Sequence, residues 1–167
     1  SWSSIPIFRL FSALQGIVCG FYTDGDQTLV LSNVRIRLLC RVIEDIPSHE
    51  PVVIWAKYHH AITAIATRLE RDHGQGAVAQ FHGGLSETAR NRELERWRSG
   101  ARFLIATQAA GGHGLDLTRA SHAVFYANGF KYSERIQAED RFHRIGQTRP
   151  VTYIDLWAEC KIEERIS

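Results

Sequence analysis

The sequence predicts an α/β fold of three layers, in which helices cover both faces of a mainly parallel β-sheet. Five short apolar runs are continuous rather than alternating, which is typical of strands covered on both faces. Helical patterns separate most of these runs, and strands that alternate with helices through short loops build a parallel sheet by right-handed crossovers. The five predicted strands are residues 51–56, 77–82, 102–107, 122–127 and 151–158.

Four helical patterns accompany these strands. The first, residues 34–46, is amphipathic and precedes the first strand. Between the first two strands, apolar residues recur every three or four positions through residues 62–69. After the second strand, Ser86 is the predicted N-cap of a helix that runs to about residue 98, and Gly100 is its stop. After the fourth strand, Ser133 is the predicted N-cap of the last helix.

Composition limits the functions that the chain can have. Its 167 residues are 44% hydrophobic and 23% charged, as in an ordinary globular domain, and the net charge of +2 neither requires nor excludes an anionic partner. No apolar run approaches the roughly 20 residues of a membrane span, so no membrane partner is expected. The cysteines are odd in number and contain no C-x-x-C pair, and the histidines lack metal-ligand spacing. We therefore expect an intracellular setting without disulfides and no metal bound by this chain alone.

The beginning of the chain differs from the rest. Residues 1–31 are less regular, and they are predicted to form an N-terminal extension with a helix that packs on this domain or on a missing neighbour. Residues 32–167 hold the α/β domain itself. The sequence contains no methionine, which predicts that it is a piece of a longer polypeptide.

A glycine-rich loop follows the third predicted strand, where functional loops of parallel sheets lie. Gly111, Gly112 and Gly114 fit neither a Walker phosphate loop nor the dinucleotide fingerprint. Glycines there permit backbone N–H groups to approach a ligand, and Asp116 would point a carboxylate at a hydroxyl or an arginine. The alternative is a tight turn in which Asp116 caps the next short helix. Lys57, at the end of the first strand, is a further candidate for a phosphate contact.

The last helix carries two arginines directly before a glycine turn. Gln137, Arg141 and Arg144 fall at i, i+4 and i+7, so they are predicted to form one stripe of this helix. A neighbouring stripe that includes Ala138 and Phe142 is apolar, and it is expected to be buried. The planar guanidinium is suited to bidentate contacts with phosphate oxygens. The alternative is a solvated charged face.

Four stretches stand in a characteristic order: "VVIWAKYHHAI", "FHGGLSETAR", "FLIATQAAGGHGLDLTRASHAVFYANGF" and "QAEDRFHRIGQTRPV". Together they resemble the second RecA-like lobe of superfamily-two helicases, and within these the Snf-type double-stranded DNA translocases. The "HRIGQ" ending is specific to the Snf-type branch. The short loops look like those of compact bacterial or phage-type members.

The resemblance implies roles for individual residues. Arg141 and Arg144 match the arginines that reach across the interlobe cleft to the β- and γ-phosphates of ATP, and Gln137 matches the glutamine that opens the same motif. Positions that match the loop along the sugar side of the nucleotide are Gly112, Gly114 and Asp116. Positions that match stretches holding the DNA phosphate backbone are Lys57, His82, Gly83, Gly84 and Thr107.

The resemblance also implies cofactors and partners. ATP and Mg²⁺ would be held mainly by a first lobe, because this sequence has neither a Walker loop nor an acidic motif at the end of a strand. The expected partners are double-stranded DNA and that N-terminal RecA-like lobe, and the chain alone would be inactive as a DNA-dependent ATPase. The compact type favours the cytoplasm of a bacterial or phage-infected cell over a nucleus. Two alternatives stay open: a non-catalytic module that binds DNA or protein, and an RNA-directed helicase, against which the "HRIGQ" ending argues.

Overall fold

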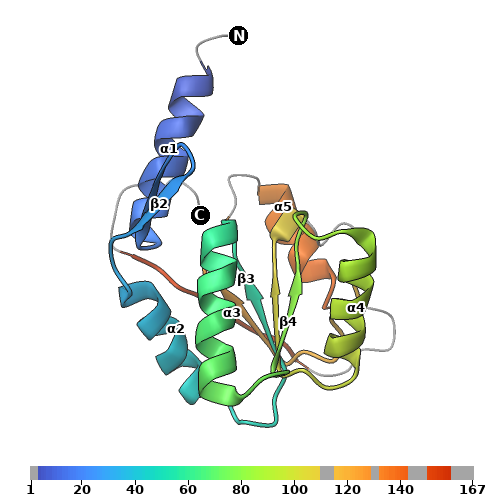
Figure 1. Cartoon of the computed structure of the whole chain (residues 1–167). Coiled ribbons are helices and arrows are strands. Elements are labelled where there is room, and N and C mark those ends of the chain that lie inside the picture. The colour runs from blue at the N-terminus through green and yellow to red at the C-terminus, as the bar shows by residue number, and fades with distance from the viewer. Residues whose placement is uncertain (1–3, 110–114, 129–131, 143–149, 159–167) are drawn as a thin grey trace.

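A five-stranded parallel sheet forms the centre of the molecule in the computed structural model, which describes residues 4–109, 115–128, 132–142 and 150–158 (Figure 1). The strands lie in the order β4-β5-β3-β6-β7, and every neighbouring pair is parallel. All five strands predicted from the apolar runs are confirmed, and the sheet is parallel as expected. Their bounds are β3 (Val52–Trp55), β4 (Val78–Phe81), β5 (Phe103–Ala106), β6 (His122–Phe125) and β7 (Thr152–Asp155).

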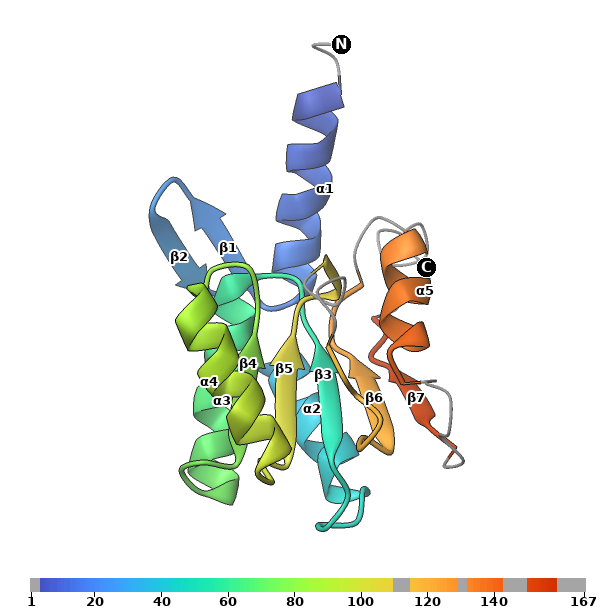
Figure 2. The same cartoon turned by 90° about the vertical axis from the view of Figure 1, so that its right-hand side faces the viewer.

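Helices cover both faces of this sheet, which confirms the predicted three layers (Figures 1 and 2). One face is covered by α2 (Val34–Glu44) and α3 (His59–His73), and the other by α4 (Glu87–Arg98) and α5 (Tyr132–Asp140). Because successive side chains of a strand point to opposite faces, β3 contributes to both cores. Ile54 lies in the core beneath α2 and α3, and Trp55 lies in the core beneath α4 and α5.

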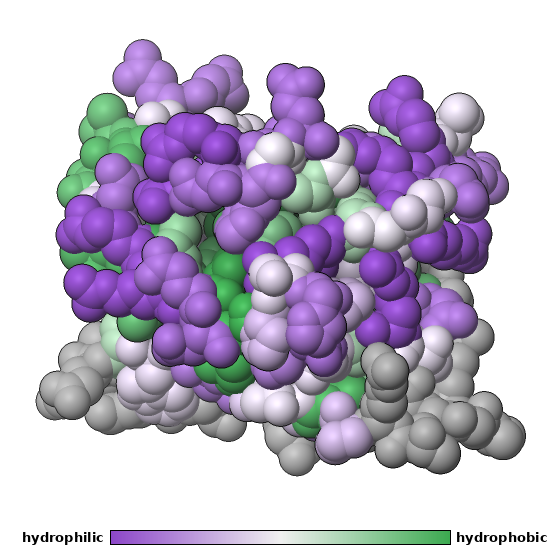
Figure 3. All heavy atoms as spheres, turned by 90° about the horizontal axis from the view of Figure 1, so that it is seen from below, coloured by the Kyte–Doolittle hydropathy of each residue, from purple (hydrophilic) through white to green (hydrophobic). Residues whose placement is uncertain are grey.

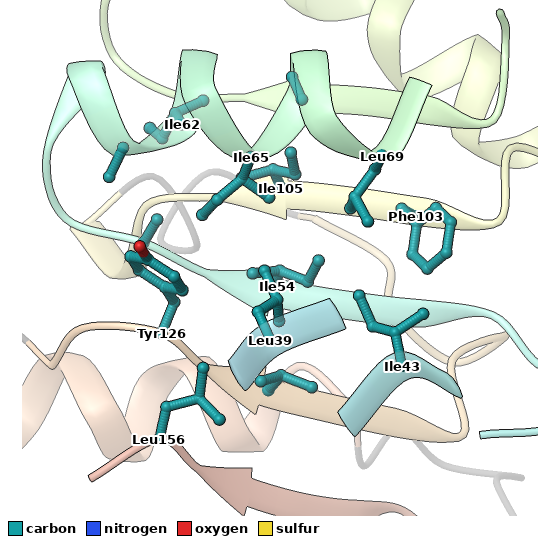
Figure 4. Packing of buried hydrophobic residues seen from close by; sticks show 14 of the residues in the cluster. Leu39, Ile43, Ile54, Ile62, Ile65, Leu69, Phe103, Ile105, Tyr126 and Leu156 are labelled. Carbon is teal, nitrogen blue, oxygen red and sulfur yellow. The ribbon is translucent and has the colours of Figure 1, made fainter. Parts of the chain in front are cut away.

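The first of these cores is formed where apolar side chains of α2 and α3 pack against the sheet (Figure 4). Ile62, Ile65 and Leu69 of α3 point toward the sheet, as the periodicity of this helix predicts, and each is at most 1% exposed. Leu39 and Ile43 of α2 reach the same core from beside them. Full burial of one such side chain is worth roughly 1.5–3 kcal/mol, so this packing fixes both helices on the sheet.

Helix α4 begins and ends where the sequence predicts. The Ser86 hydroxyl accepts a hydrogen bond of 3.2 Å from the Ala89 N–H, which is the predicted N-cap. Gly100 follows the helix with a φ of +119°, a conformation that favours glycine. The helix also protects the sheet edge, because the Glu93 carboxylate accepts a 2.9 Å hydrogen bond from the Gln80 N–H of the edge strand β4.

The N-terminal segment forms a helix and a hairpin. Helix α1 (Ser4–Val18) was expected, but the antiparallel hairpin of β1 (Phe21–Asp24) and β2 (Gln27–Val30) was not. The Gly-Asp pair at its turn, residues 25 and 26, is a hairpin signal, and Gly25 adopts a φ of +56° there. Phe21 is buried in the core shared by α2 and α3, so the hairpin is anchored on the domain.

The last helix differs from its prediction at both ends. Ser133 lies inside α5 rather than at its N-cap, because the helix already begins at Tyr132. The helix ends at Asp140, and Arg141 lies in the turn that follows it. The Phe142 N–H donates to the carbonyl of Glu139, three residues back, which is a tighter turn than an α-helix makes. The prediction that Arg141 continues one helical stripe from Gln137 is therefore wrong.

Candidate functional site

The carboxyl ends of the central strands meet at one edge of the sheet. Trp55 of β3 is paired with Ala106 of β5 and with Phe125 of β6, and Ala106 is paired with Phe81 of β4. The residues that follow these strands are therefore neighbours along this edge. The predicted DNA-contact positions lie here: Lys57, His82, Gly83, Gly84 and Thr107.

Lys57 is half-buried at the end of β3. Its Nζ donates a 2.8 Å hydrogen bond to Oε1 of Gln15 in α1, and it lies 5.1 Å from the centre of the Tyr58 ring. Burial lowers the pKa of Lys57 to about 8. The side chain is therefore mostly charged at pH 7 and loses its charge as the pH rises through 8.

His82 shapes the loop after β4. Its imidazole is only 4% exposed, and Nδ1 accepts a 3.2 Å hydrogen bond from the Gly84 N–H. Burial, with a smaller contribution from the charge of His59, lowers the pKa of His82, so the ring is neutral at pH 7. Gly83 and Gly84 are exposed, and a Cβ added to Gly84 would lie only 3.1 Å from His82 Nδ1. The two glycines are therefore the exposed part of this loop, and the buried His82 side chain holds the loop backbone from beneath.

Thr107 follows β5 at the same edge. Its N–H donates a 3.2 Å hydrogen bond to the Phe81 carbonyl, which extends the pairing of the two strand ends. The side chain of Thr107 is half-buried. The neighbouring Gln108 is buried, and its Nε2 donates a 3.3 Å hydrogen bond to Oδ1 of Asn128, which follows β6.

Asp116 caps a turn. Its Oδ1 accepts hydrogen bonds from the Thr118 N–H at 3.0 Å and from the Thr118 hydroxyl at 2.7 Å. The alternative in which Asp116 caps a short helix is only partly met, because a turn and not a helix follows it, and a contact with a nucleotide sugar stays a prediction. Gly112 and Gly114, the other two nucleotide-site predictions, lie outside the described residues.

The turn after α5 is anchored by buried side chains on both sides of Arg141. Ala138 and Phe142 are fully buried, as predicted, and Phe142 packs edge-on against Trp55 with ring centres 6.4 Å apart. Arg141 is half-buried, and Gln137 is exposed. The backbone that carries Arg141 is thus fixed to the core, whereas Arg144 lies outside the described residues.

The residues of this edge lie in a stretch of the chain that matches a known protein family. Residues 34–146, about two thirds of the chain, match the helicase conserved C-terminal domain. The chain belongs to this helicase family. The resemblance predicted from its sequence is therefore confirmed.

Individual relatives of the helicase domain agree with this assignment. This chain is 34% identical over 119 residues to the DNA repair protein rad8 of Schizosaccharomyces pombe. The match covers 70% of this chain and 10% of the relative. The chain is 30% identical over 157 residues to the DNA repair protein RAD5 of Candida glabrata, covering 90% of this chain and 14% of the relative. The chain thus spans only a small part of the length of these proteins.

A solved structure supports the fold of the helicase domain. The C-terminal part of the Fun30 ATPase domain superposes with a TM-score of 0.70, at 24% sequence identity, over 79% of this chain and 43% of that one. The sheet and its covering helices therefore form a RecA-like helicase lobe, as the sequence predicts.

The sequence reading of this helicase lobe missed three residues at the edge. Gln15, Asn128 and Arg135 come from α1, the loop after β6 and α5, and hydrogen bonds link them to the predicted site. Arg135 also makes a bidentate ion pair with Asp155 of β7, at 2.6 and 3.1 Å. Nothing in the local sequence marked Gln15, because its partners lie far along the chain.

The described part of the helicase lobe offers no metal site of its own. Within residues 4–109, 115–128, 132–142 and 150–158, no three His, Cys, Asp or Glu side chains gather in a way that could hold a metal ion. Among the helices in these same ranges, none is long and apolar enough to cross a membrane. The opposite end of the sheet, seen from below in Figure 3, presents a mostly hydrophilic face.

Proposed function

We propose that this chain is the second motor lobe of an ATP-dependent double-stranded-DNA translocase of the Snf type. The observation that carries the proposal is that Lys57, Gly83 and Gly84 lie along the same sheet edge from which α5 leads to Arg141. One edge of the lobe would then both grip DNA and reach a nucleotide. The lobe would be inactive as an ATPase by itself.

The nucleotide would lie between this lobe and a first lobe of the same polypeptide. The first lobe would hold ATP and Mg²⁺, which supply the energy of phosphate hydrolysis. Arg141 and Arg144 would contact the β- and γ-phosphates as arginine fingers, and such a finger is worth about 10³–10⁵ in rate in other phosphoryl-transfer systems. Gln137 would open the same motif. Gly112, Gly114 and Asp116 would line the sugar side.

The DNA contacts would be made to the phosphate backbone. Lys57 supplies a positive charge, and the exposed Gly83 and Gly84 leave space for a phosphate to approach their backbone. Thr107 would contribute its side chain, and His82 would act through the loop that it supports. Because phosphate contacts carry no sequence information, we expect binding that depends on salt but not on base sequence.

Residues 1–31 would pack on this lobe and also contact the first lobe. Most of the large exposed apolar side chains among the described residues lie in α1, the hairpin and the start of α2, including Leu10, Leu29 and Val30 at 58–59% exposure. Such a concentration marks an interaction surface. We assign it to contact with the first lobe, in addition to the anchorage of Phe21 on residues 32–167.

Two other functions fit the same fold. A non-catalytic module that binds DNA or protein would keep the lobe but lack a phosphate loop elsewhere in its reading frame. An RNA-directed helicase would keep the motor but respond to RNA. The expected intracellular location follows from DNA as substrate under the first proposal, and the preference for the cytoplasm stays a prediction.

The test is the rate of ATP hydrolysis by the complete polypeptide with duplex DNA, duplex RNA or no nucleic acid. The proposal expects strong stimulation by duplex DNA and little by RNA. Stimulation by RNA alone would favour the RNA-directed helicase. Hydrolysis that neither nucleic acid stimulates would favour the binding module.

A further inference from the structure

The Gln15 side chain is buried, and both its amide oxygen and its amide nitrogen make hydrogen bonds. It is 1% exposed, near the end of α1, where this helix rises from the carboxyl edge of the sheet (Figure 2). Its Oε1 accepts hydrogen bonds from Lys57 Nζ at 2.8 Å and from the Tyr58 hydroxyl at 2.9 Å. Its Nε2 donates a 2.8 Å hydrogen bond to the Asn128 carbonyl. One side chain thus bridges the ends of β3 and β6.

The bridge continues to the helix that leads to the arginine motif. Oδ1 of Asn128 accepts a 3.2 Å hydrogen bond from Arg135 of α5, and Nδ2 of Asn128 donates to Asp155 at 3.4 Å. Arg135 also pairs with Glu139, one turn further along α5. Hydrogen bonds therefore lead from Lys57 through Gln15 and Asn128 into α5.

The chemistry of the Lys57 ammonium and the Gln15 amide suits a coupling role. A lysine ammonium has three donors, so Lys57 can keep its bond to Gln15 while it donates to a DNA phosphate. Gln15 would then hold the ammonium in place before DNA arrives, which lowers the entropy cost of that contact. The amide also carries no charge that would repel or neutralise its neighbours.

We propose that Gln15 is a positioning residue, which couples the contact between Lys57 and DNA to the placement of α5 and hence of Arg141. The inference rests on the proposed motor function and deepens it. It also makes α1 part of the motor, although α1 lies before residues 34–146 that match the helicase family. These contacts amount to coupling only if a change at Gln15 alters both the DNA contact of Lys57 and the function of α5. The experiment below measures both.

The test measures DNA-stimulated ATP hydrolysis of the complete polypeptide while duplex DNA is titrated. Lys57→Gln removes both the charge at the DNA end and the ammonium that bonds Gln15, so it should raise the half-stimulating DNA concentration about fivefold to tenfold and also lower kcat at saturating DNA. Gln15→Leu should raise the same concentration and also lower kcat at saturating DNA by about fivefold or more, because α5 loses its tie. Gln75→Leu, the same substitution at an exposed glutamine between α3 and β4, is the control and should leave both values within about twofold of wild type.

A second variant covers the case in which Gln15→Leu fails to fold. Gln15→Glu keeps the side-chain volume and the oxygens that accept from Lys57 and Tyr58, but it cannot donate to the Asn128 carbonyl. At a melting temperature within a few degrees of wild type, it should still lower kcat at saturating DNA.

Each outcome decides between the proposals. If a folded Gln15 variant keeps kcat at saturating DNA within twofold of wild type, the coupling is wrong, whatever happens to the DNA concentration. In that case stimulation of the wild type, and its weakening by Lys57→Gln, would still uphold the motor function. If DNA does not stimulate the wild type, the motor function fails, and the coupling fails with it.

Discussion

The charge of Lys57 makes DNA affinity depend on pH. Burial lowers its pKa from the usual 10.5 to about 8, so roughly half of the side chains are charged at pH 8 and about one in ten at pH 9. A DNA phosphate attracts only the charged form, and its own negative charge raises the pKa of Lys57 in the complex. Above pH 8, binding must therefore take up a proton. If the neutral form binds about fivefold to tenfold more weakly, linkage lowers the affinity about threefold to fivefold between pH 7 and pH 9, which is about 0.7–1 kcal/mol. A lysine of ordinary pKa would change affinity by only a few per cent, by the same linkage.

The assay is fluorescence anisotropy of a short labelled DNA duplex at fixed salt, at both pH values. Lys57→Arg is the matched control, because a guanidinium keeps its charge throughout this range. We expect wild type to bind about threefold to fivefold more weakly at pH 9 and Lys57→Arg to change less than about twofold. Equal affinity of wild type at the two pH values would refute the reasoning. An equal loss in Lys57→Arg would assign the effect to another group.

Four further substitutions test stability, measured as the free energy of unfolding in urea. Ser86→Ala removes the acceptor of the Ala89 N–H and should cost about 1 kcal/mol, whereas no change would show that the cap is not needed. Gly25→Ala should cost about 1 kcal/mol because of its φ of +56°, although a Cβ there meets nothing within 4 Å. Gly83→Ala, which also has open space but no such φ, should change stability by less than about 0.5 kcal/mol while weakening DNA binding; equal costs at both glycines would contradict this. Phe142→Ala empties a fully buried site and should cost about 3–5 kcal/mol, and a cost below about 1 kcal/mol would mean that the turn carrying Arg141 is not anchored there.

Much of the fold could be predicted because the sheet is covered on both faces. Each strand is a continuous apolar run, and the observed strands lie inside the predicted ones. The hairpin was missed because β2 is exposed along its whole length and therefore shows no alternation of buried and exposed positions. Its sequence signal is the Gly-Asp pair at residues 25 and 26. The end of α5 was also missed, since buried Ala138 and Phe142 keep helical spacing although the turn has already begun.

The site could be predicted only where strand topology decides it. The carboxyl ends of parallel strands share one edge, so the proximity of Lys57, Gly83 and Thr107 follows from the strand assignment. The partners of Gln15 could not be predicted, because Asn128 lies 113 residues further along the chain and no local pattern connects them. The burial of His82 could not be predicted either, since histidine is intermediate in its tendency to be buried.

The central claim is that the arginine motif after α5 serves ATP hydrolysis. The most direct measurement is DNA-stimulated ATP hydrolysis by the complete polypeptide, with wild type beside Arg141→Ala and Arg144→Ala. Arg98→Ala, an exposed arginine of α4, is the control. We predict that turnover falls by about 10³-fold or more in Arg144→Ala and markedly in Arg141→Ala, while DNA affinity changes by less than about threefold. Turnover near the wild-type rate in both variants would contradict the account and assign the arginines to binding or structure.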